Sequence, residues 1–250
     1  MKRFKTLIFA TKKETSGKIT YFCGFPEVFL CFTEKIKNKP DNLTPVFSIE
    51  GGAVIENDSD RVFELQNDGI RFLTLAWNGE NAIAGGINSD KCLTDFGKEV
   101  IEKMNRLKMG CDLSHLNKES FYKVLEFSEF SLATHSNCKE ICDHPRNLEL
   151  AQIKLLFEKK GIMGLCFYPL FLGGDVFEKI YQNIYLLCDK GYENNIAIGS
   201  DFDGAGMSEK LDNISKVPLL YRFLEERGIE RGVLDKIFYK NAYNYIANLK

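Results

Sequence analysis

The chain has 250 residues, of which 44% are hydrophobic and 27% are charged. This length suits one domain with a full hydrophobic core, and this composition excludes a disordered chain. The formal net charge is −2 and the basic residues are spread along the chain, which argues against a protein that binds nucleic acid.

No apolar run reaches the roughly 18 residues that a membrane-spanning helix needs, so we expect no membrane interaction. Residues 5–10 follow a basic start, but the polar residues 11–14 stand where a signal peptide would continue its apolar core. We therefore interpret 5–10 as a strand. The eight cysteines are scattered, several of them in apolar runs, which favours reduced thiols in a cytoplasmic protein.

Seven short β-type segments recur along the chain, and most are separated by segments with helical periodicity. Residues 94–107 show the clearest amphipathic pattern, residues 117–120 open a helix over 121–127, and Asp175 is suited to cap a helix over 176–190. This alternation predicts a parallel sheet with crossover helices in one domain, residues 1–250. The predicted strands are residues 5–10, 46–50, 71–77, 110–115, 131–135, 161–168 and 195–201.

Four of these strands end on side chains that bind metals, namely Glu50, His115, His135 and Asp201. A strand buried on both faces has little other reason to end on a carboxylate or an imidazole. Taken singly, each residue is more simply a helix cap or a turn residue. Four in the same relative position, at the end of a barrel where active sites are built, predict convergence around a shared cation. The third histidine, His144, precedes a proline in a loop, where we expect a solvated or outer-shell group.

Short segments from residue 46 onward share their order and spacing with one known family. The segments are FSIEGG (47–52), LTLAWN (73–78), DLSH (112–115), THSN (134–137), HPRN (144–147) and IGSDFDG (198–204). Together they resemble the membrane (renal) dipeptidase family, the zinc dipeptidases of the amidohydrolase-like barrels. The resemblance implies an α/β fold, a (β/α)8 barrel of the TIM type, that acts on dipeptides or similar small carboxylated substrates.

The resemblance also implies a role for each matching residue. Glu50 matches the carboxylate that bridges two zinc ions, and His115 and His135 match the imidazole ligands of the second zinc. Asp201 matches the acidic residue that handles the proton of the attacking water and of the departing amine. Arg146 matches the residue that holds the substrate carboxylate, for which a planar guanidinium is well shaped.

Three further positions are weaker candidates. Tyr168 ends its strand on the same barrel face and is a candidate for substrate binding. Trp77 stands where some family members place a substrate-contacting histidine, and it is either a wall of the substrate pocket or a packing residue. Asn241 occupies a family-like position near the C-terminus. The family often forms dimers, so a homodimer is one candidate, but the sequence leaves the oligomeric state open.

One element of the family pattern is missing. The family begins with a strand ending in His-x-Asp that binds the first zinc, and no His-x-Asp occurs in this sequence. Residues 5–10 followed by the helix-like 22–37 resemble the second β/α unit, so we expect seven strands and a barrel that lacks its first unit. We favour Met1 as an internal start over a genuine short form with exposed strand edges. We expect one zinc ion or none, and weak or absent peptidase activity.

Three interpretations of the function remain open. The first is zinc-dependent hydrolysis of the peptide bond of dipeptides. The second keeps the metal site but takes another small amide, a lactam or another carboxylated ligand. The third is a degenerate barrel that binds a ligand or partner without turnover, and zinc content would separate it from the first. Mixed carboxylate and imidazole ligands accept several divalent ions, so the working metal is also open.

Overall fold

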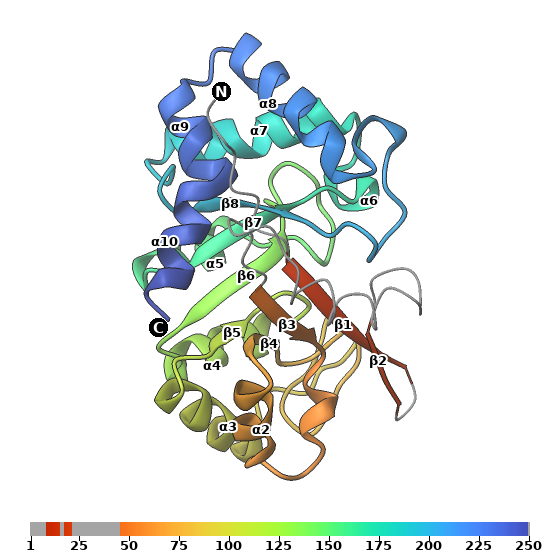
Figure 1. The fold of residues 1–250 in the computed structure, drawn as a ribbon, viewed down its shortest axis with the longest axis vertical. Helices are drawn as coiled ribbons and strands as arrows, with labels where there is room; N and C mark the ends of the chain where they lie inside the picture. The colour runs from red at the N-terminus through yellow and green to blue at the C-terminus, as the bar shows by residue number, and fades with distance from the viewer. Residues whose placement is uncertain (1–8, 16–17, 22–45, 250) are drawn as a thin grey trace, which may run out of the picture. The chain divides into compact units, whose positions relative to one another are not determined.

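The structure is a computed structural model that describes residues 9–15, 18–21 and 46–249. It is an α/β fold in which the chain forms two compact units. The first unit extends to Phe130 and includes Leu249, and the second contains Ser131–Asn248 (Figure 1). The helix expected at 22–37 lies outside the described residues.

The first unit is built on five strands in the order β2-β1-β3-β4-β5. Strands β1, β3, β4 and β5 are parallel neighbours, whereas β2 pairs antiparallel with β1. The parallel part matches the expected arrangement, and the antiparallel β2 was not predicted. The bounds are β1 Phe9–Thr15, β2 Lys18–Tyr21, β3 Val46–Glu50, β4 Ile70–Thr74 and β5 Gly110–Asp112.

Helix α3 of the first unit begins where the sequence predicts. The Thr94 side chain accepts a hydrogen bond from the Gly97 amide at 2.9 Å, which caps the first turn. Val100, Ile101 and Met104 on its apolar face are fully buried, in agreement with the helical spacing of its apolar residues. Asn117 caps α4 in the same way by accepting from the Ser120 amide. The helical elements of this unit are η1 Gly52–Ile55, α2 Arg61–Asn67, α3 Asp95–Arg106 and α4 Lys118–Phe127.

The second unit is built on the parallel strands β6 (Ser131–Ser136), β7 (Ile162–Cys166) and β8 (Ile196–Ser200). These strands approach one another closely at two glycines. A Cβ atom on Gly164 would lie 2.2 Å from the Thr134 carbonyl oxygen, and one on Gly199 would lie 2.0 Å from the same atom. Only glycine fits at such a close backbone approach.

The helices of the second unit are fixed by caps and by one buried amide. The Asp175 side chain accepts hydrogen bonds from the Phe177 and Glu178 amides, which confirms it as the N-cap of α7. Asn241 donates from Nδ2 to the carbonyls of Glu193 and Ile196, so this residue joins α10 to the start of β8. The bounds are α5 Leu150–Glu158, α6 Pro169–Leu172, α7 Val176–Asp189, η2 Glu209–Leu211, η3 Ile214–Lys216, α8 Val217–Glu226, α9 Arg231–Asp235, η4 Lys236–Lys240 and α10 Asn241–Ala247.

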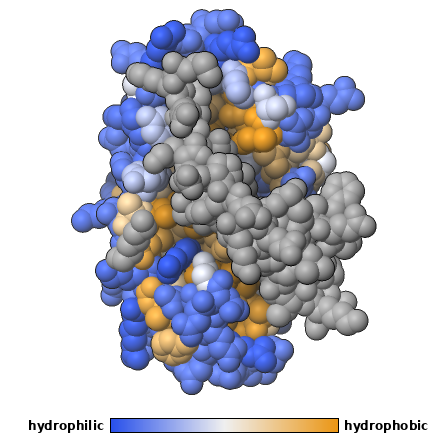
Figure 2. All heavy atoms as spheres, viewed as in Figure 1, coloured by the Kyte–Doolittle hydropathy of each residue, from blue (hydrophilic) through white to orange (hydrophobic). Residues whose placement is uncertain are grey.

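Polar and apolar side chains are unevenly distributed over the surface, as expected for amphipathic helices and strands. Figure 2 shows that the visible face of the described residues is largely hydrophilic, with apolar side chains gathered in a few patches. None of the helices in the described part of the chain is both long and apolar enough to span a bilayer.

Six of the seven predicted strands are present. Strand β3 ends where expected and β6 ends one residue later, whereas β4, β5, β7 and β8 end one to three residues earlier than expected. Residues 75–77, 113–115 and 167–168 leave the sheet and form the loops that follow β4, β5 and β7. The first predicted strand, 5–10, overlaps β1 only at its last two residues, and residues 5–8 lie outside the described residues. The described residues thus contain eight strands where seven were predicted.

Candidate functional site

A buried contact between a carboxylate and an imidazole joins the ends of two strands in the first unit. Glu50 is the last residue of β3, and His115 follows β5 by three residues. Their Oε1 and Nε2 atoms are 2.7 Å apart, and the two side chains are 7% and 8% exposed. A buried carboxylate is stable only beside a positive charge. The two side chains are therefore candidates for part of a cation-binding site.

The turn that presents His115 is held by Asp112 at the end of β5. The Asp112 carboxylate accepts from the Thr74 hydroxyl at 2.6 Å and from the Ser114 amide at 3.1 Å. His115 itself has a φ of 73°, in the left-handed region that a non-glycine residue adopts only where its surroundings hold it. The local fold thus fixes the backbone from which the imidazole extends.

The partner of His115 Nδ1 determines the tautomer of the ring, and therefore whether Nε2 can act as a ligand beside Glu50. His115 Nδ1 lies 2.8 Å from Asn78 Oδ1, and an amide oxygen can only accept, so Nδ1 carries the proton. When the ring is neutral in this tautomer, Nε2 carries the lone pair that faces the Glu50 carboxylate. Two acceptors at this distance require a cation, either a second proton or a metal ion. Metal-binding histidines show this same arrangement.

His135 is the third member of this group. It lies in β6, it is 4% exposed, and its Nδ1 atom is 2.8 Å from the Thr134 hydroxyl. Glu50, His115 and His135 each offer one ligand atom, and these atoms all lie within 4.8 Å of one another. One carboxylate and two imidazoles are a donor set that suits zinc and other divalent ions. Of the four residues expected around a cation, these three are therefore brought together.

Asp201 follows β8 directly, at a point of concentrated backbone strain. Ser200, Asp201 and Asp203 have φ angles of 40°, 67° and 66°, and none of them is a glycine. A Cβ atom on Gly204 would lie 2.3 Å from Asp201 Oδ1, so the glycine leaves room for this carboxylate. Strain of this kind persists where the surrounding structure enforces it, and it clusters at functional sites.

Cys166, which ends β7, is a neighbour of Asp201 that the sequence did not single out. Its Sγ atom is 3.9 Å from Asp201 Oδ2. Burial raises the pKa of the Cys166 thiol, and the charge of Asp201 raises it further. The thiol therefore stays protonated and donates a weak hydrogen bond to the carboxylate. The six cysteines in the described residues are free, which agrees with their interpretation as reduced packing residues.

Arg146 and Tyr168 are brought together by one aromatic ring, Phe171 of α6. The Arg146 guanidinium carbon lies 5.3 Å from the Phe171 ring centroid, and the Tyr168 ring meets Phe171 edge-on at 4.8 Å. His144 packs against the same ring at 4.6 Å. Asn147 holds the loop in place by donating to the Cys142 and Phe171 carbonyls. Phe171 has no polar atom to mark it, so sequence reasoning missed it.

The family model described as membrane dipeptidase (peptidase family M19) matches residues 33–248. The chain belongs to this family.

Two relatives and one solved structure illustrate the likeness of this chain to known proteins. An uncharacterized protein of Klebsiella pneumoniae is 27% identical and is matched over 94% of this chain and 90% of its own length. An uncharacterized dipeptidase of Schizosaccharomyces pombe is 30% identical over 87% of this chain and 57% of its own length. A metallopeptidase of Rhodobacter sphaeroides, solved with a phosphinate mimic of the dipeptide L-Ala-D-Ala, is 26% identical with a TM-score of 0.79, covering 90% of this chain and 67% of its own. The chain thus spans little more than half the length of the S. pombe dipeptidase.

Trp77 borders the dipeptidase site on the side of His115. Its side chain is 42% exposed, and its ring centroid lies 6.0 Å from that of His115 at a tilt of 41°. An indole that is half in water beside a buried imidazole is not a core residue. This placement fits a wall of the substrate pocket and a packing residue at the rim equally well.

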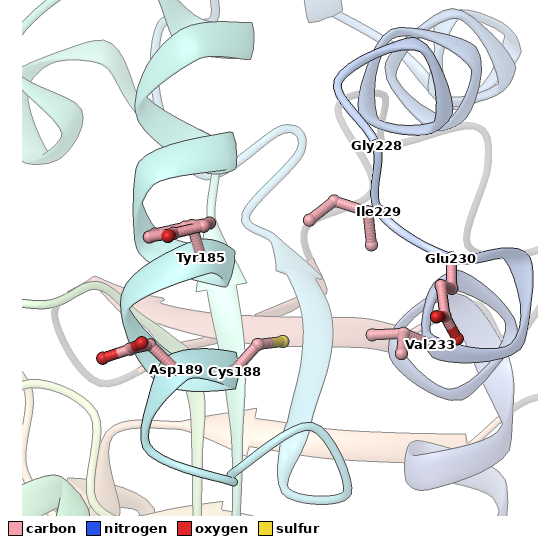
Figure 3. A pocket seen from close by; sticks show the side chains of 7 residues that line it. All are labelled: Tyr185, Cys188, Asp189, Gly228, Ile229, Glu230 and Val233. Carbon is pink, nitrogen blue, oxygen red and sulfur yellow. The ribbon is translucent and has the colours of Figure 1, made fainter.

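A separate pocket in the second unit contains none of the candidate residues. Its volume is about 210 Å³, and in Figure 3 Cys188 of α7 and Val233 of α9 face each other across it. Burial raises the pKa of Cys188 to about 11, so the thiol is neutral and a poor nucleophile near pH 7. This pocket therefore offers no chemistry comparable to that of the Glu50 group. It is lined by Tyr185, Cys188, Asp189, Gly228, Ile229, Glu230 and Val233.

Proposed function

We propose that this chain carries the active site of a metal-dependent dipeptidase that hydrolyses the peptide bond of dipeptides. The observation that carries the proposal is the buried group of Glu50, His115 and His135, with ligand atoms within 4.8 Å of one another. Membership of the membrane dipeptidase family supports it. So does the dipeptide mimic bound by the similar R. sphaeroides metallopeptidase.

In this proposal Glu50, His115 and His135 hold the metal, and zinc is the ion that the donor set fits best. A bound divalent ion supplies a Lewis acid and lowers the pKa of water from about 16 towards 7. The fit does not depend on the family, because the proton on His115 Nδ1 already leaves Nε2 available as a ligand. We propose one zinc ion per chain, the upper limit of the one or none expected from the missing His-x-Asp.

The remaining candidates act on protons and on the substrate. Asp201 would accept the proton of the attacking water and pass it to the departing amine, a role that suits a carboxylate with a neutral thiol beside it. Arg146 would bind the substrate carboxylate, because its buried guanidinium is a preorganised fork for a planar anion. Tyr168, on the same Phe171 ring, would line this part of the substrate site.

At the level of the whole chain, we propose one hydrolase domain of the (β/α)8 TIM-barrel type. The parallel strands with crossover helices in each unit support this assignment. We also propose a cytoplasmic location, on the ground of the free cysteines, and a homodimer. Size-exclusion chromatography with light scattering tests the dimer.

The proposed activity is tested with purified protein, zinc and a panel of dipeptides that includes L-Ala-D-Ala. We expect zinc-dependent hydrolysis that is lost in His115→Ala and His135→Ala, together with bound zinc measured by mass spectrometry of the metal. His144→Gln is the matched control, because this histidine lies outside the Glu50 group and should retain zinc. Stoichiometric zinc in both alanine variants would contradict the site, and zinc binding without hydrolysis of any dipeptide would favour a binding protein.

A further inference from the structure

The loop after β4 holds Asn78 in a fixed position. The Asn78 carbonyl accepts from the Asn88 amide at 2.7 Å, and the Gly79 carbonyl accepts from the Gly86 amide at 2.8 Å. A Cβ atom on Gly86 would lie 1.6 Å from the Trp77 carbonyl oxygen, so the two stretches of the loop cross at a position that only glycine can occupy. The backbone on both sides of the Asn78 side chain is thereby fixed.

The same loop also holds His115. The Ile87 amide donates to the His115 carbonyl at 2.9 Å, and Gly86 forms an isolated bridge with Leu116. One short stretch, residues 86–88, thus bonds to the backbone of both Asn78 and His115. The 2.8 Å contact between the Asn78 side chain and the imidazole is therefore built into the backbone of the first unit.

We propose that Asn78 is a positioning residue for His115, which keeps the proton on Nδ1 and the Nε2 lone pair aimed at a cation shared with Glu50. Without an acceptor at Nδ1, the imidazole could rotate about χ2 or carry its proton on Nε2. Either change removes the ligand atom from the place where it meets Glu50 Oε1. The inference rests on the proposed function, because it takes His115 as a metal ligand.

The test compares variants that remove or keep the acceptor. Asn78→Leu removes it in a side chain of similar size, whereas Asn78→Asp keeps an oxygen in the same place. We expect Asn78→Leu to weaken zinc binding by roughly 10- to 100-fold and Asn78→Asp to remain near the wild-type affinity. Affinity is measured on the full chain by competition with a chromophoric zinc chelator. The absorption spectrum of bound cobalt(II) reports a change in ligand geometry.

Asn105→Leu is the matched control in the same unit. Its side chain donates to the Phe127 carbonyl at 2.8 Å and accepts from the Glu129 amide at 3.0 Å, and it has no contact with the imidazole. We expect this variant to lose stability while zinc affinity stays unchanged. Circular dichroism checks that each variant is folded.

The outcomes separate this inference from the proposed function. Wild-type zinc affinity in Asn78→Leu, or equal losses in Asn78→Leu and Asn78→Asp, would overturn the positioning role while zinc binding that depends on His115 still stands. Zinc binding that is unaffected by His115→Ala would overturn the metal site itself and the inference with it.

Discussion

The Arg146 guanidinium is a buried cation that packs against an aromatic ring. Its side chain is 4% exposed and lies 5.3 Å from the Phe171 centroid. Burial of a cation is costly, and the Phe171 ring face offsets part of that cost. A fixed, poorly hydrated guanidinium is well prepared to bind an anion, which agrees with its proposed role for the substrate carboxylate.

Arg146→Lys tests this role at the level of one residue. Lysine keeps the charge but loses the planar fork, so we expect the KM for a dipeptide to rise by roughly tenfold or more, the equivalent of one charged hydrogen bond. The KM for the same dipeptide with an amidated C-terminus should change little on this substitution. Steady-state kinetics on both substrates measures the difference. An equal rise in KM for both substrates would show that Arg146 does not bind the substrate carboxylate.

His144 predicts a pH dependence of stability. Burial lowers the pKa of His144 below its ordinary value of 6.5, and the charge of Arg146 lowers it further. The unfolded chain then takes up a proton at a higher pH than the folded chain. The stability that the neutral ring contributes is complete above pH 6.5 and declines as the pH falls from 6.5 towards the lower folded value.

His144→Gln removes this titration. We expect the free energy of unfolding, measured in urea, to fall less steeply in this variant than in wild type as the pH drops below about 6.5. Because the chain has three histidines, an NMR titration can follow the His144 ring directly. An unchanged pH slope would contradict the prediction.

At the level of elements, the close packing of β6, β7 and β8 depends on glycine. The Thr134 carbonyl lies where a Cβ atom on either Gly164 or Gly199 would clash. His135 and Asp201 follow these contacts along β6 and β8, so the spacing of the strands sets the spacing of the side chains at their ends. A change in strand packing should therefore affect the site as well as stability.

Gly164→Ala tests this packing. We expect a loss of about 1–3 kcal/mol in the free energy of unfolding, because the added methyl forces the strands apart. Gly232→Ala in α9 is the matched control, since nothing lies within 4 Å of its Cβ position and alanine favours a helix. Urea denaturation measures both variants. Equal free energies of unfolding for Gly164→Ala and Gly232→Ala would show that the strands can move apart without a loss of stability.

At the level of the whole molecule, metal binding and folding are coupled. The Glu50, His115 and His135 ligand atoms lie on segments that are far apart in the chain, so only the folded state gathers them. A ligand that binds the folded state alone stabilises it by mass action. The midpoint of thermal unfolding should therefore depend on zinc.

We expect zinc at about 100 times its dissociation constant to add roughly 2.7 kcal/mol to the free energy of unfolding. A strong chelator should reverse the effect, and His135→Ala should abolish it. Differential scanning calorimetry with and without zinc provides the measurement. Equal stabilisation of wild type and His135→Ala would place the zinc elsewhere on the protein.

Much of the fold and the kinds of residue at the site could be predicted from the sequence. Asp175 and Asn117 cap helices through bonds to amides two or three residues away, and such local chemistry is visible in a linear pattern. Glu50 and His135 stand at or near the ends of short apolar runs, so their shared position at strand ends was visible too. Their roles came from a family resemblance, which the match over residues 33–248 confirms as membership.

Only the tertiary structure shows what orients these side chains. Asn78 meets His115 across 37 positions in the sequence, and Phe171 packs against Arg146 without any polar signal of its own. The antiparallel β2 and the crossing of Gly86 over Trp77 were not predicted either, although their partners lie nearby in the chain. Hydrophobic periodicity and helix capping depend on residues a few positions apart in the chain. The orientation of a ring and the close approach of two backbone segments depend on contacts that form only when the chain has folded.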